Sequence, residues 1–343
     1  MTFDVAIAGG GPAASVTAML LARAGASCVI LERDDDAGDK AGESLPPAAR
    51  PLLDELGVWD DLARDGHRPC HGNRSVWGSE VAEEMPFVFT PYEHGWHLDR
   101  RRFELMLADR AVAAGAERRT NARVTDVAPH RLTCADGTVV EAGTLIDATG
   151  RAAALARRLG ARRVVDHALV ALVAFLENGG RGMDDSFTLV EAVEEGWWYS
   201  APLPDARLVA MFVSDRLYND WDALLASATH TRERIRAHGY ALRHAPRRVD
   251  AGSARLDRAA GEGWLAIGDA ATALDPLSSH GLGNAIATGM NAARAVLNGD
   301  VARYTATVDA MWNGYVALRR GTYALEQRWP DSRFWRRSLI ASS

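Results

Sequence analysis

The chain opens with a pattern of apolar and polar positions that predicts a strand, a helix and a second strand. An apolar run at residues 5–8 leads into a glycine-rich turn, a helical stretch follows at 15–24, and residues 27–32 form another apolar run. Two such strands joined by a helix are the parallel βαβ unit of doubly wound α/β proteins. We therefore expect a parallel sheet at the start of the chain.

The remaining pattern predicts a return to this first sheet after an excursion through antiparallel strands. A late apolar run that ends in Gly268-Asp269 has the character of one more parallel strand. In chain order, the predicted elements are antiparallel strands within 72–98, a helix at 102–114, strands at 124–127, 139–140 and 145–150, strands at 168–176, 187–193 and 208–213, a helix ending near 235, a strand at 264–271, a helix from about 282, and helical spacing over 301–337.

Composition and charge exclude several classes of protein. With 343 residues, 48% of them hydrophobic, the chain is long enough for roughly two domains. A net charge of −6 disfavours a nucleic-acid partner. The three cysteines lack metal-ligand or disulfide-framework spacing, so we expect no metal site. The apolar runs are too short for a membrane span and no export signal is evident, which together predict a cytoplasmic protein.

The first glycine-rich turn has the spacing of a dinucleotide-binding fingerprint. In Gly9-x-Gly11-x-x-Ala14, the first glycine turns the chain, the second lets backbone approach a pyrophosphate, and the alanine permits close helix packing. The N-terminus of the following helix then faces the phosphates. Glu32 ends the second strand, where it can accept a hydrogen bond from the adenosine ribose, and Arg33 beside it is a further candidate for cofactor binding.

A second motif distinguishes FAD from NAD. Asp269 follows an apolar strand, and carboxylates at such strand ends face the ligand crevice. We expect Asp269 to bind a ribityl chain, which NAD lacks. The segment 275–284 leads into a helix whose free N–H groups would lie against the flavin, where negative charge develops on reduction.

The predicted fold class is therefore α/β, with a Rossmann-like FAD-binding domain, an inserted antiparallel β-sheet substrate domain and C-terminal helices. The FAD-binding domain is discontinuous because its two motifs lie at opposite ends of the chain. Its predicted segments are 1–75, 95–165 and 253–300, the substrate domain takes 76–94 and 166–252, and the C-terminal helical segment takes 301–343.

Several segments together resemble the FAD-dependent monooxygenases of the p-hydroxybenzoate hydroxylase fold. The resemblance is to the branch with flavin-dependent halogenases and the maturases that hydroxylate peptidyl aromatic residues during quinone-cofactor formation. The segments that carry it are 9–14, 42–47, 72–79, 95–100, 147–151, 196–202 and 268–269.

The resemblance implies roles for further residues. Arg100 is expected near the pyrophosphate or ribityl region of FAD. Glu43 and Ser44 are expected on a loop close to the isoalloxazine, where Glu43 is a candidate catalytic group. The backbone amides expected at the flavin ring are those of Pro276, Gly281 and Leu282.

Aromatic and histidine side chains are the candidates for the substrate site. Trp197, Trp198 and Tyr199 could form a stacking wall for an aromatic substrate. The alternative is that one set belongs to the core, since alternate residues of a strand point to opposite faces. His280 lies in the flavin-facing loop and is the candidate proton donor or acceptor, with a loop histidine that bonds backbone or solvent as the alternative.

The resemblance also implies a reaction. Reduced flavins of this class react with O2 to give a C4a-hydroperoxide, which an electron-rich aromatic ring attacks; halogenases divert it with a lysine located well beyond the 42–47 segment. The single lysine, Lys40, precedes that segment, and residues 197–202 match the halogenase W-x-W-x-I-P signature only in part. Hydroxylation of an indole or phenol ring, free or borne on a peptide or carrier, is the favoured hypothesis, with a halogenase as the alternative.

Readings from other classes also stay open. One is a non-catalytic flavin-binding assembly factor for a partner protein, and another is a lipid double-bond reductase. Electrons would come from NAD(P)H that docks transiently or from a separate flavin reductase, because no second dinucleotide fingerprint is present. The aromatic and basic residues of 328–337 either form a partner surface or pack a terminal helix on the body.

Overall fold

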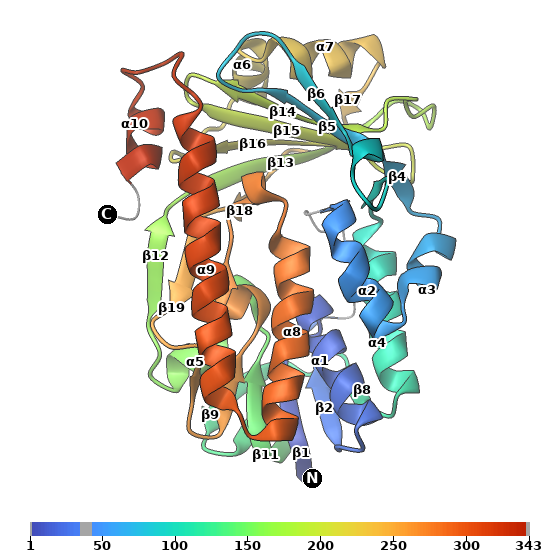
Figure 1. Ribbon diagram of the computed structural model, residues 1–343, viewed down its shortest axis with the longest axis vertical. Coiled ribbons are helices and arrows are strands. Elements are labelled where there is room, and N and C mark those ends of the chain that lie inside the picture. The colour runs from blue at the N-terminus through green and yellow to red at the C-terminus, as the bar shows by residue number, and fades with distance from the viewer. Residues whose placement is uncertain (1, 35–42, 341–343) are drawn as a thin grey trace.

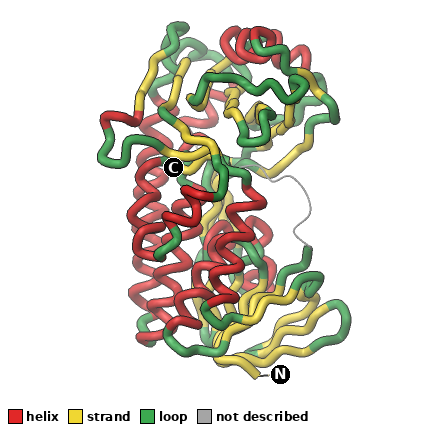
Figure 2. The backbone as a smooth tube through the Cα atoms, turned by 90° about the vertical axis from the view of Figure 1, so that its right-hand side faces the viewer, coloured by secondary structure: helices red, strands yellow, loops and turns green. Residues whose placement is uncertain are grey.

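The computed structural model describes residues 2–34 and 43–340. The two largest sheets, here called the lower and the upper sheet, follow one another along the long axis of the molecule (Figure 1). Lys40 and Gly42 lie outside the described residues. Seen from the side, helices fill the middle of the molecule, with strands at the bottom and the top (Figure 2). No helix in these two ranges combines the length and the apolar character that a membrane crossing requires.

The lower sheet is parallel at its centre and contains the predicted βαβ unit. Strand β1 pairs in parallel with β2 and β11, and β11 pairs in parallel with β21. The strand order is β20–β21–β11–β1–β2–β8, with β10 also paired to β11 and β9 paired to β10. The strands are β1 (Thr2–Ala8), β2 (Cys28–Leu31), β8 (Glu117–Arg119), β9 (Val124–Ala128), β10 (Arg131–Cys134), β11 (Val139–Asp147), β20 (Ala260–Gly261) and β21 (Trp264–Ala266).

The upper sheet is the predicted insertion. It is antiparallel except where β14 pairs in parallel with β5, and its order is β17–β13–β16–β15–β14–β5–β6, with β18 also on β13. Because β5 belongs here, the predicted boundary after residue 75 cuts through a strand of this sheet. The strands are β5 (Gly72–Val76), β6 (Glu83–Pro86), β13 (Val170–Glu177), β14 (Phe187–Val193), β15 (Gly196–Pro202), β16 (Leu208–Ser214), β17 (Ala241–Leu242) and β18 (Arg247–Asp250).

Two further sheets of three strands each lie between the lower sheet and the upper sheet (Figure 1). Helices run alongside them. The helix α9 runs from the lower part to the upper part (Figure 1). The small sheets are β3 (Ser44–Leu45), β7 (Gly95–His97) and β4 (Arg68–Cys70), and β12 (Arg163–His167), β19 (Ser253–Leu256) and β22 (Thr272–Ala273). The helices are α1 (Pro12–Arg23), α2 (Arg50–Leu56), α3 (Trp59–Arg64), α4 (Arg100–Ala113), α5 (Ala154–Arg158), α6 (Trp221–Ala226), α7 (Thr229–Ala237), α8 (Gly281–Asn298), α9 (Val301–Ala324) and α10 (Arg333–Ile340).

The C-terminal aromatic residues pack against the upper sheet. Phe334 and Trp335 are 1% and 2% exposed and share one buried cluster with Trp197 of β15 and Tyr323 of α9. The indole N–H of Trp335 donates to the carbonyl of Val193 at 3.1 Å. The aromatic side chains of the terminal segment therefore hold a helix on the body, as one of the two interpretations expected.

Helices α1 and α8 cross at very close range. A Cβ atom on Gly289 would lie 2.7 Å from the carbonyl oxygen of Ala13, closer than side chains tolerate. At the same crossing, the Thr17 hydroxyl donates to the Gly289 carbonyl at 3.0 Å. The absence of a side chain at residue 289 thus lets the two helices approach. We call the region beyond the carboxyl ends of β1, β11 and β21, where open α/β sheets are expected to bind ligands, the crevice.

Replacing Gly289 by alanine should loosen this crossing. The added methyl group must displace the backbone of α1, and overpacking of this kind costs about 1–3 kcal/mol. Gly314→Ala is the matched control, because Gly314 is an exposed glycine of α9 with no atom within 4 Å of an added Cβ. Urea unfolding should show Gly289→Ala destabilised and Gly314→Ala unchanged or stabilised by up to about 1 kcal/mol. Equal stability of the two variants would contradict the tight crossing.

Candidate active site

The glycine-rich turn adopts the geometry that a dinucleotide requires. Gly9 has φ +101°, and a Cβ there would lie 2.2 Å from the carbonyl oxygen of Ala148, so only glycine fits. Gly11 is the N-cap of α1 without a side-chain cap, and a Cβ there would meet no atom within 4 Å. Ala14 is fully buried beneath the turn. The backbone at Gly11 therefore faces open space at a helix N-terminus, where an anionic phosphate is favoured.

The acid at the end of β2 holds the other side of this turn. The Glu32 carboxylate accepts hydrogen bonds from the backbone N–H of Gly10 at 2.5 Å and of Asp34 at 3.1 Å. Arg33 points away from the turn, since its side chain is 71% exposed and pairs with Asp34 at 3.0 Å. Glu32 thus supports the glycine-rich turn, and its hydrogen bond to a ribose stays a prediction, whereas the Arg33 side chain lies in solvent.

A second open helix N-terminus faces the same crevice. Helix α8 begins at Gly281 with no side-chain cap and no acidic residue in its first turn. Gly281 and Gly283 have no atom within 4 Å of an added Cβ, whereas Leu282 is 7% exposed and packs into the core. The N-termini of α1 and α8 are both uncapped and lie about two turns apart along α8, so each of them favours a negatively charged group of a ligand.

Asp269 lies between these helices beside two arginines. Its Oδ2 atom is 3.5 Å from Nε of Arg151, and its side chain keeps 35% of its exposure. Burial raises the pKa of Asp269, while the charges of Arg151 and Arg100 lower it. The Arg100 guanidinium also donates to the Glu104 carboxylate at 2.5 Å, which orients it along α4. The predicted pair Arg100 and Asp269 therefore shares one electrostatic environment.

Arg151 connects two distant segments of the chain by hydrogen bonds. It lies in the 147–151 segment, for which the sequence predicted no role of Arg151. Its guanidinium donates to the carbonyl oxygens of Gly252 at 2.5 Å and Leu274 at 2.7 Å. The turn before it is held by Asp147, whose carboxylate accepts from the backbone N–H groups of Thr149, Leu155 and Ala156 at 2.8–2.9 Å. The carbonyl partners are distant in sequence, so no local pattern could have assigned this role.

The segment after Lys40 meets the upper sheet through a buried chain of hydroxyl groups. Ser44 Oγ is 2.7 Å from the Tyr199 hydroxyl and 3.4 Å from Thr188 Oγ1. The Thr188 hydroxyl in turn lies 2.9 Å from Nε2 of His97. Glu43 beside Ser44 is 3% exposed, and its carbonyl accepts from the N–H of Leu98 at 2.8 Å. These contacts fix the loop that carries Glu43 and Ser44 against β14 and β15.

Burial keeps the titratable members of this chain neutral near pH 7. Desolvation raises the pKa of the Tyr199 phenol, and the nearby Glu43 carboxylate raises it further. Desolvation, with the charges of Arg234 and Arg68, lowers the pKa of His97 to about 3. His97 is fully buried, and its Nδ1 atom has no hydrogen-bond partner among residues 2–34 and 43–340. These groups can orient a neighbour by hydrogen bonding without carrying charge.

The three aromatic residues predicted as a substrate wall do not share one face. Trp197 is fully buried and its indole N–H donates to the Tyr323 hydroxyl at 3.0 Å. Trp198 points to the opposite face of β15, where it packs against Phe212 and Trp221 beneath α6 and α7. A wall of all three residues is therefore wrong, because strand alternation separates the middle one. Tyr199, at the Ser44 loop, is the member of the trio nearest the crevice.

Asp275 fixes the start of the segment 275–284, the second of the two segments that are predicted to face the flavin; the first is the loop with Glu43 and Ser44. Its Oδ2 atom accepts from the Tyr323 hydroxyl at 2.7 Å, and its Oδ1 atom caps the short turn Pro276–Ser278 by accepting from the N–H of Leu277 at 2.8 Å. Tyr323 also receives the Trp197 indole N–H, so one hydrogen-bond chain joins β15, α9 and this turn. Burial raises the pKa of Asp275 to about 6. The sequence predicted no role for Asp275 or Tyr323, because their burial and their hydrogen bond exist only in the folded protein.

His280 lies at the start of α8. It is an exposed residue whose backbone N–H donates to Ser278 Oγ at 3.3 Å and whose side chain does not cap the helix. Partial desolvation lowers the pKa of His280, so the neutral ring that can accept a proton predominates at pH 7. Its catalytic role, like that of Glu43, stays a prediction.

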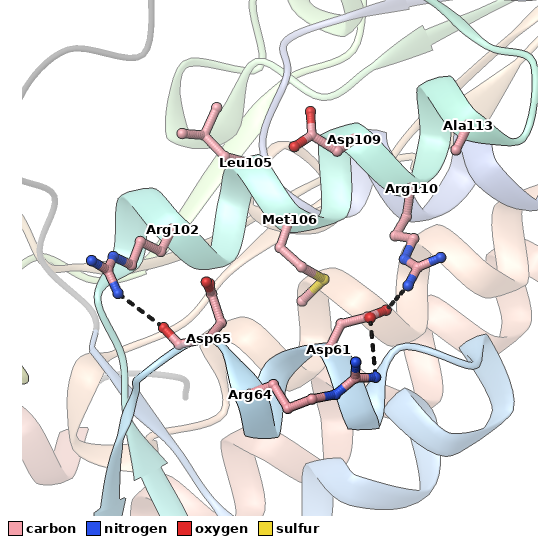
Figure 3. A pocket seen from close by; sticks show the side chains of 9 residues that line it. All are labelled: Asp61, Arg64, Asp65, Arg102, Leu105, Met106, Asp109, Arg110 and Ala113. Atoms are coloured by element: carbon pink, nitrogen blue, oxygen red, sulfur yellow. Dashed lines mark hydrogen bonds and ion pairs between the residues drawn. The ribbon is translucent and has the colours of Figure 1, made fainter.

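A separate hollow of about 630 Å³ lies between α3 and α4 (Figure 3). Asp61 pairs there with Arg110 at 2.5 Å and with Arg64 at 3.7 Å, and Arg102 donates to the Asp65 carbonyl at 3.1 Å. None of the predicted site residues lines this hollow. Its charges pair with one another, so we assign it no role. The described residues hold no group of three or more metal-ligating side chains.

The crevice between the sheets fits FAD. The uncapped N-terminus of α1 with the open backbone at Gly11 suits a pyrophosphate, the uncapped N-terminus of α8 suits a flavin ring, and the partly exposed Asp269 carboxylate suits a ribityl hydroxyl. Glu32 would bind the ribose, and Arg100 would lie near the pyrophosphate or the ribityl chain. The fold and this crevice are those of the FAD-dependent oxidoreductases.

Comparison with known proteins defines the family. The tryptophan halogenase family model matches residues 73–341. The chain is 27% identical to LodB of Marinomonas mediterranea, named as an FAD-dependent oxidoreductase, over 98% of this chain and 96% of that one. It is also 27% identical to a 1H-pyrrole-2-carbonyl-[peptidyl-carrier protein] brominase of Pseudoalteromonas luteoviolacea, over 86% of this chain and 77% of the relative.

A solved structure shows the same fold. The peptidyl tryptophan dihydroxylase QhpG superposes with a TM-score of 0.81 at 23% identity, covering 98% of this chain and 79% of that one. The chain belongs to the tryptophan halogenase family. The predicted α/β fold class and the assignment to FAD-dependent oxidoreductases are thereby confirmed, as is the resemblance to the branch that contains flavin-dependent halogenases.

Removing the Asp269 carboxylate should weaken FAD binding. We expect Asp269→Ala to raise the Kd for FAD roughly tenfold or more, the effect of losing one charge-assisted hydrogen bond. Asp109→Ala, which removes an aspartate from the outer hollow, is the control. Flavin fluorescence quenching during titration measures both. Unchanged affinity in Asp269→Ala would refute the placement of this carboxylate at the cofactor.

Asp275 should make stability depend on pH. Its folded-state pKa of about 6 exceeds the ordinary 3.8, so the folded protein holds this proton more tightly than the unfolded chain. The resulting stabilisation is present at low pH and is lost as pH rises through 6. Relative to Asp275→Asn, the wild-type protein should gain about 1 kcal/mol of unfolding free energy between pH 7.5 and 5. Denaturant unfolding across this range measures the gain, and a constant difference would contradict it.

Proposed function

We propose that this chain is an FAD-dependent monooxygenase that hydroxylates an electron-rich aromatic ring of the indole or phenol type. The observation that carries the proposal is the lysine content. Lys40 is the single lysine of the chain, and no lysine follows the 42–47 segment, where the resemblance implies that halogenases need one. An oxidoreductase of this family without that ammonium group is expected to transfer oxygen directly to the ring.

When bound, reduced FAD supplies the activation of O2. The chain's own residues position the ring and exclude water from it. The Ser44–Tyr199 hydrogen bond at 2.7 Å and the Tyr323–Asp275 hydrogen bond at 2.7 Å hold the two flavin-facing segments against the upper sheet. Because Tyr199 and His97 stay neutral, they orient neighbours and leave proton transfer to His280, with Glu43 as the second candidate.

The substrate is proposed to be carried by a polypeptide. The pyrrole brominase named above acts on a substrate attached to a peptidyl carrier protein, and QhpG is named for a peptidyl tryptophan. These names support a tethered aromatic group, while a free small molecule is the alternative. The electron donor is proposed to be NAD(P)H that docks transiently, or a flavin reductase that delivers reduced FAD.

Halogenation is the second candidate function, and the family match favours it. The partial match to the W-x-W-x-I-P signature argues against it, because Tyr199 and Ala201 stand at the positions of the second tryptophan and of the isoleucine. A non-catalytic assembly factor would bind FAD without consuming O2 in response to any substrate.

The products distinguish these functions. The protein is incubated with FAD, a flavin reductase with NADH, O2 and bromide, together with indoles and phenols in free and peptide-borne form. We expect mass spectrometry to show a gain of one oxygen atom, derived from labelled O2, and no bromine. Asp269→Ala, which should retain little FAD, is the inactive control. Bromine in the product would establish a halogenase instead, and the absence of any substrate-dependent O2 consumption would refute an oxygenase.

A further inference from the structure

An exposed apolar patch occupies residues 79–93, around β6 at the end of the upper sheet. Val81, Met85, Val88 and Phe89 are 71%, 56%, 65% and 87% exposed, four large apolar side chains within nine residues. Exposed apolar side chains elsewhere in the described chain occur singly or as the neighbouring pair Val164 and Val165. Four exposed apolar side chains so close together in the sequence favour an interaction site.

The same patch is acidic. Glu80, Glu83, Glu84 and Glu93 are exposed, and residues 79–93 contain no lysine or arginine. The nearest arginine, Arg74 of β5, is engaged by Glu84 at 2.7 Å and by Asp185 at 2.8 Å. The patch therefore presents negative charge around its apolar centre, which is complementary to a partner that is both basic and apolar.

The character of β6 excludes simple strand addition by a second copy of this chain. Two glutamates and Pro86 stand on this edge strand, and charges and proline are the features that keep sheet edges from pairing. Two such patches facing each other would also bring like charges together. A partner is expected to bind through side chains placed over Val88 and Phe89.

The patch is joined directly to the flavin-facing loop. The backbone N–H of Phe87 donates to the His71 carbonyl at 2.7 Å, and the chain then enters β7, which pairs with Ser44–Leu45. A Cβ on Gly95 would lie 2.5 Å from the Leu45 carbonyl oxygen, so these two segments are in close contact. A partner on the patch would therefore lie near the small sheet that holds the Ser44 loop.

We infer that the 79–93 patch docks the polypeptide that carries the aromatic substrate, through a segment of that polypeptide which is cationic and apolar. This inference rests on the proposed function and adds the recognition surface and the charge of the partner. Binding at the patch would raise the local concentration of the tethered ring at the crevice. Apolar anchors at Val88 and Phe89 would supply affinity, and the glutamates would supply steering and selectivity.

Synthetic peptides test the inference without requiring turnover. The probe is a peptide with one tryptophan flanked by leucines and arginines, compared with the same peptide with glutamate in place of arginine. Fluorescence anisotropy measures its affinity for the FAD-loaded wild type, for Val88→Ser/Phe89→Ser, and for Glu80→Lys/Glu83→Lys. Leu318→Ser is the matched control, since Leu318 is an exposed apolar residue of α9 at 49% exposure.

The expected result is salt-sensitive binding of the cationic peptide that weakens about tenfold or more in both patch variants and is unchanged in Leu318→Ser. FAD content and oxidation of free indoles should be the same in all four proteins. Equal binding of the anionic peptide, or patch variants that bind as well as the wild type, would overturn the inference. Sedimentation velocity tests whether a second copy of this chain binds the patch instead. An oligomer of the wild type that dissociates in the patch variants would make the patch a contact between copies and would overturn the inference.

The outcomes separate this inference from the proposed function. Patch-dependent binding without oxygen insertion into any aromatic ring would refute the proposed function alone. Oxygen insertion into free indoles with no patch-dependent binding would refute the docking surface alone.

Discussion

The close crossing of α1 and α8 is the constraint on which the site depends. Gly289 brings the backbone of α8 against Ala13, and the Thr17 hydroxyl bridges the two helices at the same point. Each helix begins with an open glycine and no side-chain cap, and the crossing places the N-terminus of α1 against the middle of α8, about two turns from the N-terminus of α8. A single ligand with negative charge at the pyrophosphate and on the reduced ring can be stabilised by both ends at once. Asp269 stands at this junction, next to Arg151 and within reach of the charge of Arg100.

Strand β15 links the upper sheet to both flavin-facing segments. From one face of this strand, Tyr199 reaches Ser44 and Trp197 reaches Tyr323, which in turn holds Asp275. The two chains of hydrogen bonds are buried, so each member must be satisfied for the interface to be stable. A displacement of the upper sheet would therefore move both segments that border the crevice. This coupling links the position of the upper sheet to the positions of the Ser44 loop and the Asp275 turn.

Several site residues were predictable because their signals are local. Gly9 and Gly11 occupy a strand-to-helix turn in which positive φ and open backbone are demanded by geometry within a few residues. Trp198 shows the limit of this reasoning, because a run of three aromatic residues on a strand cannot all face one ligand. His97 has no local signal for its role, because only burial in the folded protein makes it a neutral hydrogen-bond partner of Thr188.

Local sequence was sufficient for the βαβ unit, the parallel character of the late strand and the choice of flavin over nicotinamide, because apolar periodicity and glycine spacing act over short stretches of chain. The convergence of Arg151 on Gly252 and Leu274, the Trp197–Tyr323–Asp275 chain and the assignment of β5 to the upper sheet arise from contacts between residues tens to more than a hundred positions apart. Such contacts form when separate apolar faces are buried together, and the packing of the two halves selects which polar groups meet. No short pattern contains that information.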